Sequence, residues 1–281
     1  MQDYYSESIP AISQFLQSHP LDYKSCVTAL RKFSEKEFGA LHLNRNPIAS
    51  QVSNYSFSQL EFIIHEYSGF SNEAIHVLVD ALIRNHDWKE LYEEIQNNID
   101  EEKGQETKGI PHLEMMRQGY KTDLGIDTDN VDYSEITLSF LKKMRKIFKH
   151  NDNAFSAGAL LAFEGTAIAE FHILDAIVKE YKQKKQVKAS GDDSVSLTSI
   201  YIDGHKDFEI GHEAHLMTAI ESYINETNIH KLIRGYFSVC FTMNMWWEQL
   251  SIESYHKSFL DVVRFNDVEE FKIANVFKEK S

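Results

Sequence analysis

The stretch 159-ALLAFEGTAIAEF-171 decides the fold class, because it lies inside 153–182, a long and strongly apolar run that predicts a buried helix. Other segments carry apolar residues at helical spacing. With only 4 Pro and 12 Gly in 281 residues, the chain lacks the turns of an all-β fold. We therefore expect an all-α bundle. The expected helices cover residues 9–18, 21–39, 57–84, 87–102, 112–123, 135–149, 153–182, 197–225 and 228–264.

Composition excludes several classes of protein. The net charge of −14, from 43 acidic and 29 basic residues, argues against binding to nucleic acid. The two cysteines, Cys26 and Cys240, form no disulfide or metal motif, which favours a reducing, cytoplasmic compartment. The opening MQDYYSES lacks the basic and apolar segments of a signal peptide. The apolar stretch 236-YFSVCFTMNMWW-247 is too short for a membrane span, so we predict none.

The segment 205-HKDFEIGH-212 places His205, Glu209 and His212 four and three residues apart, on one face of a helix. Imidazole and carboxylate together suit iron, manganese or zinc, and several converging carboxylates favour iron or manganese. The alternative is a solvated polar helix face in a histidine-rich region, because His215 follows three residues after His212. The spacing thus predicts metal ligands without excluding a surface role.

Glu164 is a lone acid in the first, very apolar part of the 153–182 helix. A buried carboxylate costs several kcal/mol unless it is paired or bound to a cation. The alternative is a position at the solvent edge of the helix. The apolar neighbours Leu160, Leu161 and Ile168, each about one turn away, favour a buried ligand.

A third piece, 100-DEEKGQETKGIPH-112, ends one helix with two acids and starts the next with His112. Alone it is weak, since acids are common at helix ends. Combined with the other two pieces, it completes three Glu and three His on several helices. Bundle proteins with two carboxylate-bridged irons use this kind of inventory.

The order D-E-E-x-G…H, then a lone Glu in an apolar helix, then HxxxExxH, resembles the haem-oxygenase-like di-iron oxidases, and CADD-like proteins in particular, over roughly residues 40–265. The resemblance implies a seven-helix, haem-oxygenase-like bundle without haem. Residues 1–39 would be an N-terminal helical extension and 266–281 a charged C-terminal tail. The metal ligands that the resemblance implies are Glu101, His112, Glu164, His205, Glu209 and His212.

The chain departs from the CADD-like pattern in several places. Its segment before His112 is a few residues longer, which leaves Glu102 and Glu106 as rivals to Glu101. Glu209 stands where Asp is commoner. The stretch 44-NRNPIASQ-51 contains no tyrosine, and Leu174 stands near the position of a lysine in those proteins. These differences argue against aminobenzoate synthesis from one of the protein's own tyrosines.

The resemblance implies a non-haem di-iron oxidoreductase that uses two Fe ions and O₂. Its substrate would be a small carboxylate-bearing molecule, an amino acid or a fatty acid. The implied reactions are hydrogen-atom abstraction, C–C fragmentation, desaturation or N-oxygenation. The alternative is a non-enzymatic binding or interaction protein with a structural or vestigial metal site. The choice of Fe or Mn, an external electron donor and a homodimer all stay open.

Overall fold

The structure is a computed structural model that describes residues 9–18, 22–185 and 196–278; within these ranges the side chains at 9–12, 16, 207–210 and 257–278 are outside the description. The described residues form helices and loops without a strand, which confirms the expected all-α class. Three short helical segments, η1 (Gly39–Leu41), η2 (Ala49–Asn54) and the π-helical η3 (Tyr120–Leu124), join the longer ones. The α-helices are α1 (Ile9–Ser18), α2 (Tyr23–Glu37), α3 (Phe57–Arg84), α4 (Lys89–Glu102), α5 (His112–Gly119), α6 (Glu135–Phe148), α7 (Asn153–Lys184), α8 (Leu197–Glu221) and α9 (Ile229–Lys278).

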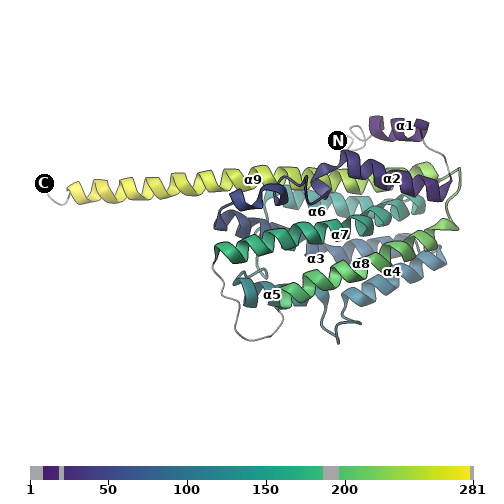
Figure 1. Ribbon diagram of the computed structural model, residues 1–281, viewed down its shortest axis with the longest axis horizontal. Coiled ribbons are helices and arrows are strands. Elements are labelled where there is room, and N and C mark those ends of the chain that lie inside the picture. The colour runs from purple at the N-terminus through teal and green to yellow at the C-terminus, as the bar shows by residue number, and fades with distance from the viewer. Residues whose placement is uncertain (1–8, 19–21, 186–195, 279–281) are drawn as a thin grey trace.

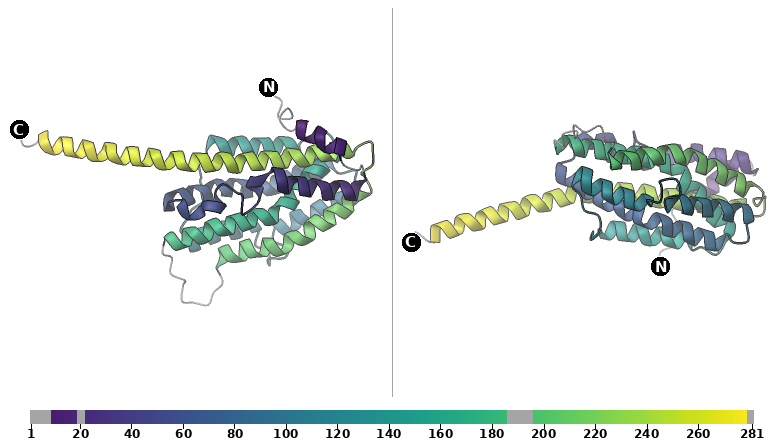
Figure 2. Two further views of the ribbon diagram at one scale, coloured as in Figure 1. Left: turned by 45° about the horizontal axis from the view of Figure 1, so that its top comes forward. Right: turned by 90° about the horizontal axis from the view of Figure 1, so that it is seen from below.

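Helix α7 is the centre of the bundle (Figure 1). It packs against α9, α8 and α3, while α6 covers α3 and α9. Helices α4 and α5 lie against α8 on another side of the bundle (Figure 2). The apolar stretch that predicts a buried helix is therefore the part of the chain around which the others assemble.

Glycines allow α7 and α9 to approach closely. A Cβ at Gly158 of α7 would overlap the carbonyl oxygen of Leu232, and one at Gly235 of α9 would overlap that of Phe155. Only glycine leaves room for the facing backbone at both positions. This close crossing fixes α7 relative to α9.

Side-chain caps start the helices that flank the core. Ser56 and Gln59 form a reciprocal capping box at α3, with Gln59 N–H donating to Ser56 Oγ at 3.3 Å. At α6, Ser134 is the N-cap, because its Oγ accepts from Thr137 N–H at 3.3 Å. Local sequence thus sets both helix starts.

The N-terminal helices pack on the same core. In α2, Cys26, Val27 and Leu30 are buried in it, and the Tyr23 hydroxyl donates to the carbonyl of Met217 at 2.9 Å. At the other end, α9 continues as helix to Lys278 and projects beyond the other helices (Figure 1). The proposed boundary at residue 39 stays a prediction.

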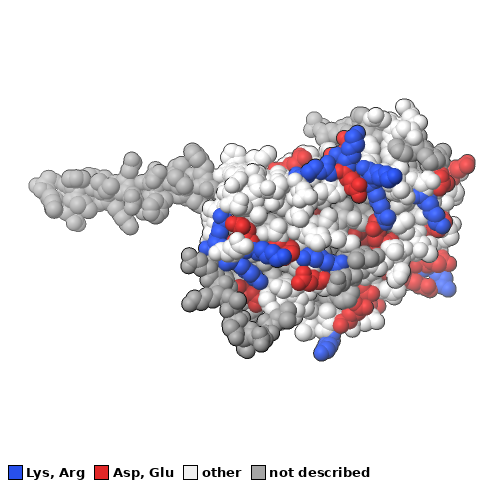
Figure 3. All heavy atoms as spheres, viewed as in Figure 1, with Lys and Arg blue, Asp and Glu red and all other residues white. Residues whose placement is uncertain are grey.

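Within the described part of the chain, α7 alone has the length and composition of a membrane span, with a window of mean hydropathy 1.3. Of that window 67% is buried inside the bundle, as expected for a core helix. On the face drawn in Figure 3, basic side chains are interspersed with acidic ones. That mixture is typical of a solvated surface.

Candidate metal centre

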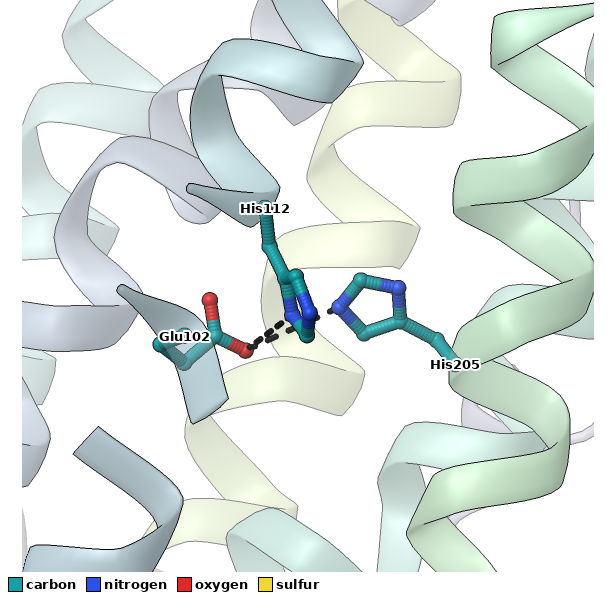
Figure 4. A group of neighbouring side chains, drawn as sticks. All are labelled: Glu102, His112 and His205. Atoms are coloured by element: carbon teal, nitrogen blue, oxygen red, sulfur yellow. Dashed lines mark ion pairs between the residues drawn. The ribbon is translucent and has the colours of Figure 1, made fainter. Parts of the chain in front are cut away.

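Three side chains from α4, α5 and α8 meet inside the bundle (Figure 4). Glu102 Oε1 lies 3.4 Å from His112 Nδ1 and 3.6 Å from His205 Nε2. One ligand atom from each residue lies within 4.8 Å of the other two. Both histidines are buried and Glu102 is partly so. We call Glu102, His112 and His205 the first triad.

The loop between α4 and α5 folds back so that the two triad residues at its ends meet. Gly104 has a φ of 99°, and a Cβ there would lie 2.6 Å from the loop's own backbone. Gly109 also has positive φ, and its N–H donates to the Gly104 carbonyl at 2.8 Å. Pro111 then precedes α5 with a φ of −56°, which suits a helix start. His112 therefore begins α5 opposite Glu102, the last residue of α4.

His205 is held in the tautomer that suits metal binding. Its Nδ1 lies 2.7 Å from the carbonyl oxygen of Tyr201. A carbonyl only accepts, so Nδ1 carries the proton and, in the neutral ring, Nε2 carries the lone pair toward Glu102. The ring of Phe171 stacks on the imidazole at 4.4 Å. Metal-binding histidines usually have such a supporting hydrogen bond.

A second group lies around His212, which follows His205 by two turns of α8. His212 Nε2 contacts Oε2 of Glu101, and His212 Nδ1 lies 3.9 Å from Oε2 of Glu164. Asn98 Nδ2 donates to Oε1 of Glu164 at 3.5 Å. We call Glu101, Glu164 and His212 the second triad.

The two consecutive carboxylates at the end of α4 contact different histidines. Glu101 lies beside His212, whereas Glu102 lies in the first triad. Glu106, the third candidate for this ligand, is exposed in the turn after α4. The side chain of Glu209 lies outside the described residues, so its role is untested. The six-ligand set stays a prediction, with Glu102 as an additional candidate.

The histidines of the first triad keep Glu102 ionised. Burial opposes ionisation, but without a metal His112 and His205 can be protonated, and their hydrogen bonds and positive charge then hold the pKa of Glu102 well below its usual range. A deprotonated carboxylate is the form that binds metal ions.

The donor set fits a metal ion. Two ligand atoms about 2.1 Å from one ion are roughly 3.0–3.4 Å apart at octahedral or tetrahedral angles. The separations of 3.4 and 3.6 Å in the first triad require only small shifts to reach that range. Mixed imidazole and carboxylate donors suit iron and manganese. The first triad can therefore hold one ion. In the second triad, Glu101 and Glu164 lie at different nitrogens of His212, so its side chains would have to rearrange to bind one ion together.

Both triads open onto one internal cavity of about 70 Å³. Glu102, His205, Glu164 and His212 line one part of it. Tyr201, which precedes His205 by one turn of α8, also lines it. The remaining lining is mostly aromatic and aliphatic, as is usual for a small-molecule site.

The sequence reasoning missed Glu170, which also lines the cavity and is 1% exposed. Its Oε1 accepts a hydrogen bond from Trp247 Nε1 at 2.8 Å. Burial raises the pKa of Glu170 to about 7, although the Trp247 hydrogen bond lowers it. The signal was present, because Glu170 is a second lone acid in the same apolar stretch as Glu164. Asn98 was also missed, and nothing in its local sequence distinguishes it from Asn97.

Comparison with known proteins identifies the family to which this chain belongs. Residues 25–253 match the model of a domain of unknown function with solved structure, DUF3865. The chain belongs to the DUF3865 family. The DUF3865 match contains every candidate ligand described above, and it begins inside α2 rather than at residue 40. None of the curated proteins matches the chain significantly.

Two crystal structures of a CADD-like protein of unknown function from Nostoc punctiforme PCC 73102 share the fold of this DUF3865 chain. The structure at 2.00 Å resolution is 23% identical, with a TM-score of 0.73 over 87% of this chain and 99% of that one. The structure at 1.35 Å is 22% identical, with a TM-score of 0.72 over 88% and 97%. The expected CADD-like bundle is therefore confirmed, and at these identities the likeness concerns the fold alone.

Proposed function

We propose that this chain is a non-haem di-iron oxidoreductase that uses O₂ to oxidise a small carboxylate-bearing substrate. The observation that carries the proposal is the meeting of two carboxylate–imidazole triads at one buried cavity. When bound, two iron ions would supply the redox chemistry with O₂, for which protein side chains have no equivalent.

The protein's own contribution is to hold the donors and exclude water. Tyr201 orients the first-triad imidazole through its carbonyl, and Asn98 orients Glu164 through its side-chain amide. The aromatic rings of Phe70, Phe163 and Phe171 line the cavity and shield it from bulk solvent. A reactive oxidant formed in such a pocket would meet the substrate rather than water.

Metal analysis of matched variants tests the site. After loading with Fe(II) and desalting, wild type should retain about two irons per chain, and His205→Ala and Glu164→Ala should each retain less. His215→Ala is the control, because His215 is on the same helix, is 69% exposed and pairs with Glu94. Unchanged iron in the first two variants would reject the site.

The reaction is tested by aerobic incubation of iron-loaded protein with a reductant and pooled amino acids and fatty acids. We expect O₂ uptake and a mass change in at least one substrate, and neither in His205→Ala. If iron binds but neither signal appears with any pool, the alternative of a binding protein with a structural metal site is favoured.

A further inference from the structure

Glu170 is a buried acid that lines the cavity. Its carboxyl group is almost completely buried, and Oε1 accepts the hydrogen bond from Trp247. The other oxygen, Oε2, is buried and has no hydrogen-bond partner among the described residues. An unsatisfied buried carboxyl oxygen is unfavourable, and such groups in native structures usually have a functional reason. Glu170 is one of the residues that line the cavity, so a molecule bound there would lie beside its carboxyl group.

Glu170 is separate from both triads. It follows Glu164 by six residues on α7, which corresponds to about 9 Å along the helix axis. Its one hydrogen bond among the described residues comes from Trp247 on α9, which belongs to neither triad. Glu170 is therefore placed to contact a different part of the substrate from the part nearest the metal donors.

The cavity has a charge pattern that favours a cation at Glu170. Three carboxyl groups, those of Glu102, Glu164 and Glu170, line it, and no Lys or Arg does so among the described residues. Iron at the triads would neutralise Glu102 and Glu164, leaving Glu170 as the uncompensated acid. Tyr67 and Phe70 add aromatic rings to the same wall, and aromatic faces attract cations.

We infer that the free oxygen of Glu170 binds a protonated amine of the substrate. The inference rests on the proposed function in taking this cavity as the substrate site. It selects an amine-bearing molecule, such as an amino acid, over a fatty acid. A substrate carboxylate finds no basic side chain in the described wall, so the metal end is the only place that suits it. The pKa of about 7 means that a nearby ammonium group readily stabilises the ionised form.

Indole NMR of the full-length protein without added metal tests the inference. The chain has three tryptophans, and the Trp247 indole signal, assigned with Trp247→Phe, reports directly on Glu170. The probes are n-butylamine, which is cationic at pH 7, n-butanol and butyrate. Five heavy atoms in the amine suit a cavity of about 70 Å³, since a water needs roughly 10–15 Å³.

We expect n-butylamine to shift the Trp247 signal saturably, and n-butanol and butyrate to leave it in place. In Glu170→Gln, apparent affinity for the amine should fall about tenfold or more, because a charge-assisted hydrogen bond is lost. The Trp246 indole, which donates to Thr137 at 3.0 Å, checks that the fold is intact. If that signal shows misfolding, Ala167→Leu replaces the variant, because it fills the cavity and should abolish the amine response.

Equal amine affinity in wild type and Glu170→Gln would overturn the inference. So would an amine response that survives Ala167→Leu, or a butyrate response that is lost in Glu170→Gln. The iron measurement is independent of this titration: a chain that binds no iron can still bind butylammonium, and an iron-loaded chain can fail to do so.

Discussion

Glu170→Gln should change how the stability of the protein depends on pH. Burial raises the pKa of Glu170 from 4.5 to about 7 in the folded state. The folded protein therefore holds a proton that the unfolded chain releases between these values. By linkage, the free energy of unfolding falls as pH rises from about 4.5 to 7 and then levels off. A difference of about 2.5 units corresponds to roughly 3 kcal/mol at about 1.4 kcal/mol per unit.

Glutamine resembles the protonated form of Glu170 in shape and charge and still accepts from Trp247. At pH 5 the two proteins should be nearly equal in stability, whereas at pH 8 the glutamine variant should be more stable by up to about 3 kcal/mol. Urea unfolding of metal-free protein at pH 5, 6, 7 and 8 measures the difference. Other titrating groups cancel in the comparison. The same pH dependence in both proteins would refute the reasoning.

Three further predictions concern helix packing and the donors. Gly158→Ala should destabilise the protein by about 1–3 kcal/mol or more through overpacking. Gly211→Ala, whose Cβ would meet none of the described residues within 4 Å, should stabilise α8 by about 1 kcal/mol. Urea unfolding of metal-free protein compares the two variants, and equal effects would contradict the packing account. Asn98→Ala removes a hydrogen-bond donor to Glu164 and should weaken iron binding about 10–100-fold. Competition with a chelator measures the iron affinity, and an unchanged affinity would show that Asn98 does not orient Glu164 for metal binding. Fe(II) should slow amide hydrogen exchange across α8, since ligand binding opposes local opening; equal protection with and without iron would contradict iron binding to α8.

The periodicity of apolar residues in the sequence was sufficient to predict most of the helices. The helix at 57–84 was predicted with the observed ends, because apolar residues at helical spacing continue through it. Helix α9 was predicted to end near 264 but continues to Lys278. Residues 265–281 were predicted to be a charged tail of uncertain order, although Phe265, Val268 and Phe271 continue an apolar spacing of three residues that is compatible with a helix.

The candidate site was predictable where one helix carries the pattern and not where a loop does. His205 and His212 share a face because of helical geometry, and both line the cavity. The choice between Glu101 and Glu102 depends on how the loop after α4 folds back. That path depends on the positive φ of Gly104 and Gly109, which spacing in the sequence does not specify. Glu170 could have been predicted as a buried acid by the same burial argument that was applied to Glu164.

Glu101 belongs to the second triad and Glu102 to the first, so a single peptide bond connects the two triads. Consecutive Cα atoms are about 3.8 Å apart by covalent geometry, and paired metal ions in proteins are typically about 3.5–4 Å apart. A tilt or slide of α4 moves both carboxylates together and leaves their mutual offset unchanged. The spacing between the two carboxylate-bearing residues at the end of α4 is therefore fixed by covalent geometry. Repacking this helix would alter its distance from α8, whereas only an inserted or deleted residue would alter that spacing.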